Sequence, residues 1–242
     1  MPRPLDHLAI LILLGTTASA SYAAVNDALD TLYTSGQSLK SLAADLSLEN
    51  SSDLGDKTTK TGSFVLQRVG DGDSRARVNF TQSKSGKRIF AERREYVLAG
   101  TDLIDRDYTA KKQVTRQIRK PGEKVDFFKL GEGPFPLPIG QSRADVLAQF
   151  DAAEEKNDDP TALAVIKLTP KPKTAMADDF KWIRVTIDRQ TKLPRVITTL
   201  SASAPERNTA TLTNVRVNDA VKDEDFKLEP INPKGWDLVG SK

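Results

Sequence analysis

The segment 180-FKWIRVTIDRQTKLPRVITTLS-201 contains two strand-like runs joined by a short connection. Apolar and polar residues alternate along each run, which is typical of a β-strand with one buried face. The connection 188-DRQTKLP-194 has the composition of a turn. We therefore predict that the two runs form neighbouring antiparallel strands.

Similar runs lie on both sides of this pair, joined by short links rich in Gly, Asp and Lys. Strands that follow one another through short links favour antiparallel neighbours in one sheet. We predict an α+β fold with a single large, curved antiparallel sheet of about ten or eleven strands, shaped as a half-open barrel. The additional runs are 42–49, 60–69, 75–82, 94–100, 102–108, 112–119, 162–170 and 208–218.

A helix is expected over 25-VNDALDTLYTSGQSL-39. Its apolar residues recur three and four positions apart, which places them on one helix face. This face must be buried, and the concave face of the predicted sheet is the available surface. The apolar face consists of Val25, Ala28, Leu29, Leu32 and Tyr33.

The segment 131-GEGPFPLPIGQSRADVLAQFD-151 interrupts the strand pattern. Three prolines in 134-PFPLPIG-140 stiffen the chain and prevent it from joining a sheet ladder. A short helix is predicted next, with Val146, Leu147 and Phe150 on its apolar face. The segment is thus expected to cover apolar surface of the sheet.

The N-terminus has the features of an export signal. A positive charge precedes the apolar run 8-LAILILL-14, which is too short to span a membrane. Small residues then offer cleavage after Ala20 or Ala23. We predict a signal peptide over residues 1–23 and an exported domain over residues 24–242; the alternative is a buried N-terminal helix.

The composition excludes most enzyme chemistries. The 36 Lys and Arg residues and 33 Asp and Glu residues are interspersed, so no basic surface for nucleic acid is expected. There is no Cys, and the only histidine, His7, lies within the predicted signal. The exported chain therefore lacks the residues that thiolate nucleophiles, Ser-His-Asp triads and nearly all zinc sites require. We predict no enzymatic activity, no metal and no cofactor.

Paired carboxylates are the remaining candidates for catalysis or Ca²⁺ binding. They are expected in solvated turns and lack the Gly and Glu frame of a calcium-binding loop. A hydrolase that uses carboxylates alone stays open as the least favoured alternative. The pairs are Asp105/Asp107, Asp158/Asp159, Asp178/Asp179 and Asp223/Asp225.

The order of several short motifs resembles the LolA-type periplasmic lipoprotein carriers. Within 183–230, a strand ends in Asp188, a turn leads to a Leu-Pro pair, and Asn-Val, Asn and Asp-x-x-Phe follow. The strand 62-GSFVLQR-68 and the block 99-AGTDLIDRDYTAKKQV-114 also resemble the pattern of this family. Together these motifs cover nearly the whole chain after the predicted signal.

The resemblance implies a half-open barrel whose helices cover a concave, apolar face. In the family, the cavity at this face takes up the acyl chains of lipoproteins. It implies a monomeric periplasmic carrier that ferries acylated lipoproteins, or another lipid, from an inner-membrane release complex to an outer-membrane acceptor. A lipid- or lipoprotein-sensing module on the same fold is the alternative.

The resemblance also indicates which residues would line and cover the cavity. Arg68 matches an arginine that, in the family, hydrogen-bonds lid carbonyl groups and keeps the empty cavity closed; a solvated surface arginine is the alternative. The lid candidates, for which a permanent plug is the alternative, are Phe135, Leu137, Ile139, Val146, Leu147 and Phe150. The cavity-lining candidates, which alternation does not separate from ordinary core, are Phe64, Leu66, Val78, Phe80, Leu103, Ile166, Leu168, Trp182, Ile183, Val185 and Ile197.

Overall fold

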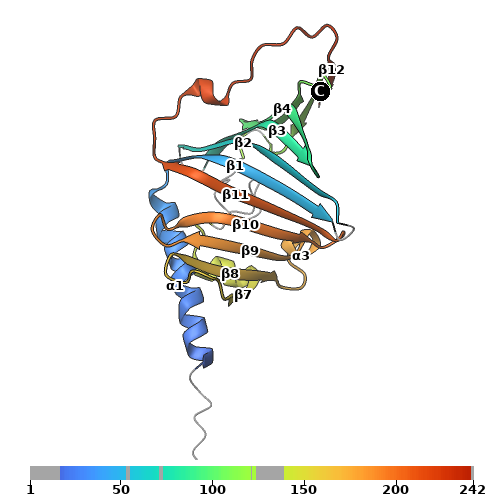
Figure 1. Cartoon of the computed structure of the whole chain (residues 1–242). Helices are drawn as coiled ribbons and strands as arrows, with labels where there is room; N and C mark the ends of the chain where they lie inside the picture. The colour runs from blue at the N-terminus through green and yellow to red at the C-terminus, as the bar shows by residue number, and fades with distance from the viewer. Residues whose placement is uncertain (1–16, 53–54, 71–72, 121, 124–138, 241–242) are drawn as a thin grey trace, which may run out of the picture.

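A single open sheet dominates the computed structural model, which describes residues 17–52, 55–70, 73–120, 122–123 and 139–240. In this part of the chain, twelve strands follow the order β12-β6-β5-β4-β3-β2-β1-β11-β10-β9-β8-β7 (Figure 1). Neighbouring strands are antiparallel except for β12, which runs parallel to β6. The predicted fold class is therefore confirmed, with slightly more strands than expected.

The additional strands lie at the two edges of the sheet. β7 replaces the last turn of the expected helix, and β12 ends the extended C-terminal segment. The strands are β1 (Ser41–Ser52), β2 (Lys57–Val69), β3 (Asp73–Ser85), β4 (Arg88–Ala99), β5 (Asp102–Asp107), β6 (Lys112–Gln117), β7 (Phe150–Glu154), β8 (Leu163–Pro170), β9 (Phe180–Asp188), β10 (Leu193–Ser201), β11 (Glu206–Val217) and β12 (Asp237–Gly240).

Helices are few in the described residues. They are α1 (Thr17–Ser38), α2 (Arg143–Gln149), α3 (Ala175–Asp179) and the 3₁₀ turn η1 (Asp223–Phe226). Ser142 caps α2, because its hydroxyl accepts a hydrogen bond from the backbone N–H of Asp145. No helix in these ranges combines the length and the apolar character that crossing a membrane requires.

The long helix α1 packs its predicted apolar face against β7, β8 and β10. Val25, Leu29 and Leu32 are almost completely buried there. Tyr33 differs from the expectation: its side chain is 39% exposed, because it lies at the margin of the apolar face. The buried face of α1 therefore consists only of small and branched apolar residues.

The face of the sheet toward α1 is here called the inner face. Directly opposed residues of antiparallel strands share a face, so the register identifies its members. Across β1, β2 and β8–β11 this face carries an almost continuous buried apolar surface, here called the apolar floor. Its members are Leu42, Ala44, Leu46, Phe64, Leu66, Ile166, Leu168, Ile183, Val185, Ile197, Ala210 and Leu212.

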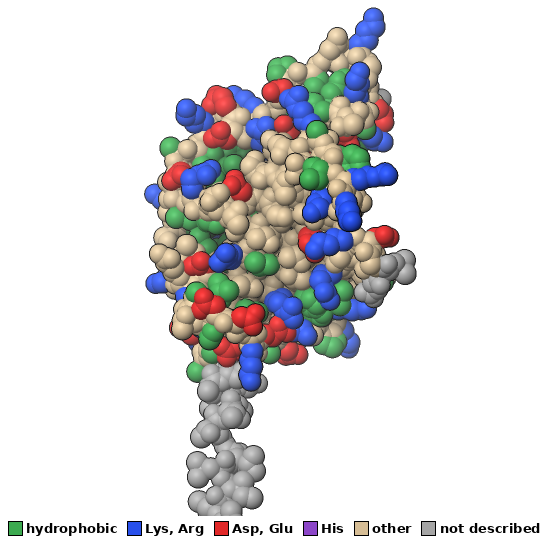
Figure 2. All heavy atoms as spheres, viewed as in Figure 1, with side chains coloured by type: hydrophobic (Ala, Val, Ile, Leu, Met, Phe, Trp, Pro, Cys, Tyr) green, Lys and Arg blue, Asp and Glu red, His purple; other side chains and the backbone are tan. Residues whose placement is uncertain are grey.

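The opposite, outer face is polar. Thr198 of β10 and Thr209 of β11 are direct neighbours there, and their hydroxyl groups lie 3.2 Å apart. Figure 2 shows this side: its centre consists mainly of backbone and uncharged polar groups, with Lys and Arg along its margins. The sheet thus buries one face against helices and leaves the other to solvent.

The C-terminal segment crosses the outer face before it ends as β12. Phe226 of η1 is buried beneath Arg75, whose guanidinium lies 4.1 Å from the ring centroid. Further along, Trp236 packs edge-on against Tyr108, with ring centroids 5.6 Å apart. These contacts hold the segment on the strands β3 to β6 and place β12 beside β6.

Candidate functional site

The predicted cavity-lining residues lie mostly together on the inner face. Nine of them are at most 4% exposed and belong to one apolar cluster with α1: Phe64, Leu66, Val78, Phe80, Ile166, Leu168, Ile183, Val185 and Ile197. Leu103 is partly buried at the border of this cluster. The cluster therefore forms a common apolar surface that a ligand could use after displacement of the covering helix.

Trp182 does not lie with the others. Successive residues of a strand point to opposite faces, and Ile183 points inward, so Trp182 is on the outer face. The cationic groups of Lys167, Arg184 and Arg207 lie 5.2 to 5.9 Å from its ring centroid. Trp182 is therefore part of a cation–π group on the outer surface and lines no inner cavity.

The lid candidates that the structure describes all contact the apolar cluster. Ile139, Val146 and Phe150 are at most 1% exposed, and Leu147 is partly buried. Phe150 begins β7 instead of ending a helix, yet its side chain still joins the cluster. The other two lid candidates, Phe135 and Leu137, lie outside the described residues. Whether these residues form a movable lid or a fixed plug stays a prediction.

The chain before α2 is docked tightly on α1. Gly140 donates a backbone hydrogen bond to the carbonyl of Leu32 (3.3 Å), and Gln37 Nε2 donates to the carbonyl of Gly140 (3.3 Å). A side chain on Gly36 would overlap the backbone N and Cα of Gly140. Glycine at position 36 is thus needed for this close approach. An ion pair between Arg143 and Asp30 (2.7 Å) adds a second connection.

Arg68 connects the end of α1 to the sheet. It lies near the end of β2, and its Nη1 donates to the carbonyls of Gly36 (2.8 Å) and Leu39 (2.9 Å). Its Nη2 lies 3.3 Å from the position that a Cβ of Gly140 would occupy. A guanidinium has several donors in a fixed plane, so it can serve neighbouring carbonyls at once. The structure places Arg68 at the junction of α1, residue 140 and β2; its lid-locking role stays a prediction.

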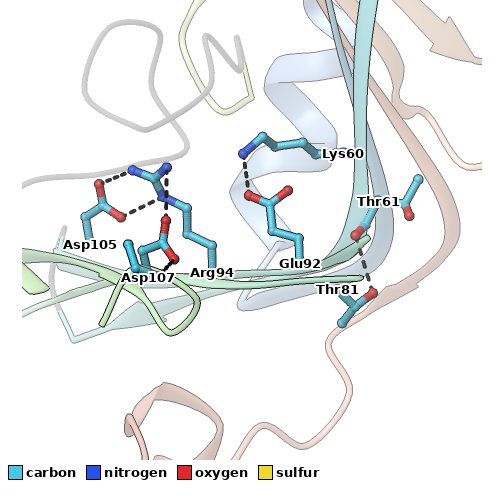
Figure 3. Close-up of polar contacts among 8 residues, drawn as sticks. Lys60, Thr61, Thr81, Glu92, Arg94, Asp105 and Asp107 are labelled. Atoms are coloured by element: carbon cyan, nitrogen blue, oxygen red, sulfur yellow. Dashed lines mark hydrogen bonds and ion pairs between the residues drawn. The ribbon is translucent and has the colours of Figure 1, made fainter. Parts of the chain in front are cut away.

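A second part of the inner face is charged. On β2, β4 and β5, five side chains project from the same side of the sheet, and Figure 3 shows them as two ion-paired groups. We call them the charged cluster: Lys60, Glu92, Arg94, Asp105 and Asp107. They are 16 to 31% exposed, so each is largely shielded from water.

Arg94 organises the larger of the two groups. It donates from Nε to Asp105 Oδ1 (3.0 Å) and from Nη2 to Asp105 Oδ2 (2.8 Å), which is the bidentate arrangement that suits guanidinium and carboxylate. Asp107 lies 3.9 Å from Arg94 Nη1. The hydrogen bonds to Asp105 raise the pKa of Arg94 above its ordinary value. Arg94 therefore stays protonated at physiological pH.

The charged cluster adjoins the apolar floor at two aromatic residues. Phe80 is 3% exposed and meets Tyr96 edge-on, with ring centroids 6.2 Å apart. Lys60 lies over Phe80 and Arg94 over Tyr96, at 5.7 and 5.3 Å from the centroids. Burial raises the pKa of Tyr96, and the negative charge of Asp105 raises it further. The inner face thus changes from apolar to charged across one pair of rings.

Two β-bulges lie beside the Lys60–Glu92 pair of the charged cluster. The register shifts between β2 and β3 at Thr61/Gly62, and between β3 and β4 at Phe80/Gln82. The hydroxyl of Thr81 donates to the carbonyl of Thr61 (3.4 Å) at this point (Figure 3). Bulges bend a strand and redirect its side chains, so Lys60 and Glu92 meet although their strands are not neighbours.

Asp105 and Asp107 do not lie in a solvated turn, so this prediction is wrong. Both lie on β5, facing Arg94. In 102-DLIDRDY-108, Leu103, Asp105 and Asp107 are two positions apart, and in a strand this spacing places them on one face. No group of three or more side chains suited to a metal ion is found among the described residues.

Comparison with known proteins gives similarity of fold only. No protein-family model matches the chain, and no curated protein sequence does. Among solved structures, MucB aligns with a TM-score of 0.48 and 14% identity over 86% of this chain and 63% of its own, so this chain spans less than two thirds of MucB. LprF from Mycobacterium bovis aligns with a TM-score of 0.43 and 14% identity over 84% of this chain and 96% of that chain.

A LolA superfamily protein is also a structural neighbour. The protein, from Nitrosomonas europaea, aligns with a TM-score of 0.35 and 10% identity over 84% of this chain and 97% of that chain. The structural neighbours thus include a protein of the superfamily that the sequence motifs resemble, at low identity. MucB has also been solved in complex with MucA of Pseudomonas aeruginosa.

Proposed function

We propose that this protein binds the acyl chains of lipoproteins, or of another lipid, on the apolar floor and carries them through the periplasm. The observation that supports this most directly is the construction of the inner face. A continuous apolar surface is covered by α1 and Ile139, and polar contacts around Arg68 and Gly36 connect this cover to the sheet. An apolar surface under a separable cover is what an acyl chain requires.

The energetics favour such a design. Hiding each CH₂ group from water is worth about 0.8 kcal/mol, so one long acyl chain gains roughly 10 kcal/mol on burial. The apolar residues of α1 gain burial on the same floor when no ligand is present. Ligand and helix then compete for one surface, which allows uptake as well as release. This competition needs no chemical step and no cofactor.

Export is supported by where the packing of α1 begins. The first buried side chain of this helix among the described ones is Val25. Cleavage after Ala20 or Ala23 would therefore leave the apolar face of α1 intact. Intact mass measurement of the protein from a periplasmic fraction tests this point. A chain that begins at Ser21 or Ala24 is expected, and an uncleaved chain would contradict export through a cleaved signal.

Native mass spectrometry of the protein from its own periplasm tests the carrier proposal. Bound mass that fragments into diacyl or triacyl species is expected, and an attached peptide would identify lipoproteins as the cargo. The purified protein should also take up a synthetic acylated peptide. Bare protein that takes up no acylated peptide would mean that the cover is a fixed plug.

A transfer assay separates the carrier from a sensing module on the same fold. The protein loaded with an acylated peptide is mixed with outer-membrane vesicles, and the peptide is followed by sedimentation. Movement into the vesicles is expected for a carrier that passes its cargo to an outer-membrane acceptor. Retention by the protein would favour a sensor.

A further inference from the structure

The charged cluster has an unusual feature for a set of ion pairs. Lys60 pairs with Oε1 of Glu92, but Oε2 of the same carboxylate is buried and has no hydrogen-bond partner among the described residues. A buried carboxylate oxygen without a donor is costly, on the order of a hydrogen bond to a charged group. Such an atom is where a donor from a ligand would be most favourable.

The balance of charge indicates which kind of donor fits. The cluster has three carboxylates and two cations, so its formal charge is −1. Arg94 already uses two donors on Asp105, and an anionic ligand would have to displace this bidentate pair. A cation meets no such competition. The unpartnered Oε2 of Glu92 therefore favours a positively charged group with N–H donors.

The position of the cluster relates this group to an acyl chain. Lys60 lies over Phe80, which belongs to the buried apolar cluster, and Glu92 is its ion-pair partner. A chain on the apolar floor that ends beside Phe80 would bring its first polar atoms to Glu92. Figure 3 shows Glu92 and Arg94 rising from the same side of β4. One amphiphile could thus contact both parts of the inner face.

We propose that Glu92, assisted by the charges of Asp105 and Asp107, binds the primary ammonium group of a ligand whose acyl chain lies on the apolar floor. This proposal rests on the acyl-binding function above and specifies the ligand as an acylated primary amine. The ammonium group donates to Glu92 Oε2, while Lys60 keeps its contact with Oε1. The amine could belong to an aminophospholipid or to an acylated peptide.

Three probes with the same dodecyl chain test the proposal. Dodecylamine offers a charge with N–H donors, dodecyltrimethylammonium offers the charge without donors, and dodecanol offers a single O–H donor without the charge. Binding is measured by competition with a fluorescent acyl probe. Dodecylamine is expected to bind roughly tenfold more tightly than dodecyltrimethylammonium, the ratio expected for one hydrogen bond to a charged group. Dodecanol should bind more weakly than dodecylamine.

Matched variants show whether Glu92 causes the difference. Glu92→Gln keeps the shape of the side chain but removes the charge, and it should reduce the preference for dodecylamine to less than about twofold. Glu49→Gln is the control, because Glu49 also forms an ion pair with a lysine, Lys57, at 2.6 Å. It should leave the tenfold preference unchanged. Circular dichroism confirms that both variants are folded.

If Glu92→Gln is not folded, Asp107→Asn serves in its place. Asp107 makes a long contact with Arg94 and accepts a hydrogen bond from the backbone N–H of Ala110 (2.9 Å), which an Asn oxygen can still accept. The substitution therefore leaves the bidentate pair intact. This variant should weaken both cationic probes about threefold and leave dodecanol unchanged. Equal affinities of Asp107→Asn and the wild type for dodecylamine would overturn the proposal.

The outcomes separate this inference from the proposed function. Equal binding of dodecylamine and dodecyltrimethylammonium would overturn the amine site and leave acyl binding standing. Tighter binding of dodecanoate, an anionic fourth probe with the same chain length, would do the same. Failure of every probe, including dodecanol, would overturn acyl binding and the amine site together. Lysophosphatidylethanolamine and a palmitoylated peptide with a free lysine, offered in parallel, then distinguish a lipid from a lipopeptide as the source of the amine.

Discussion

The two parts of the inner face obtain their order in different ways. The apolar floor belongs to one buried cluster with α1, Ile139, Val146 and Phe150, and its residues are almost inaccessible. The charged cluster is held by ion pairs whose members keep 16 to 31% exposure. Burial is non-directional, whereas ion pairs require fixed partners. In the proposed function, the floor exchanges a helix for an acyl chain, and the proposed amine site selects its ligand by geometry.

The largest expected effect is on the apolar floor. Leu32 of α1 is fully buried against it, so Leu32→Ala should lower the free energy of unfolding by about 2–5 kcal/mol. Urea denaturation measures the change. Asp107→Asn in the charged cluster is the comparison, and it should cost less than about 1 kcal/mol because this ion pair is long and partly exposed. Similar losses for both variants would break the distinction between the two parts.

The close contact of α1 with residue 140 gives the second prediction. Gly36→Ala introduces a methyl group that overlaps the backbone of Gly140, so the variant should lose about 1–3 kcal/mol. Hydrogen exchange should accelerate at the N–H of Gly140, which bonds to the carbonyl of Leu32. Thr34→Ala, at an exposed position of α1, should leave this exchange unchanged. Unaltered protection in Gly36→Ala would mean that the contact is not part of the cover.

The apolar floor could be predicted from the sequence, and the charged cluster could not. Alternation along 180-FKWIRVTID-188 indicates one buried face on each strand, and the floor follows from that rule alone. The same rule places Trp182 and Ile183 on opposite faces of the sheet, so the prediction that both line the cavity is wrong for Trp182. The Lys60–Glu92 pair instead depends on two β-bulges, which bring the two side chains together. Nothing in the alternation of residues fixes where such bulges occur.

The edge strands were missed for a related reason. The segment 150-FDAAE-154 has few residues with high β-propensity and follows directly on a helical pattern. It becomes β7 because it pairs with β8, and because Phe150 is buried in the apolar cluster. β12 likewise forms only where the C-terminal segment reaches β6. Both strands depend on tertiary contacts that distant parts of the chain supply.

The third prediction concerns the connection at Arg68. Arg68→Leu removes the donors to the carbonyls of Gly36 and Leu39, and we expect a loss of about 1 kcal/mol with the fold retained. Exchange should accelerate in the last turn of α1 and at Gly140, but not in the central strands. Arg68→Lys should restore part of the protection, because it keeps a donor. Equal protection of these amides in wild type and Arg68→Leu would remove the lid-locking role.

The smallest expected effect is at the boundary between the two parts. Burial raises the pKa of Tyr96 above its ordinary value near 10, so the folded protein keeps this proton more firmly than the unfolded chain does. The resulting stability is present below about pH 10 and is lost as the pH rises through the folded-state pKa. Between pH 9 and 11, the melting temperature of Tyr96→Phe should therefore fall less than that of the wild type. An equal fall would show that Tyr96 is as well solvated as in the unfolded chain. The buried apolar part of the inner face would then end at Phe80.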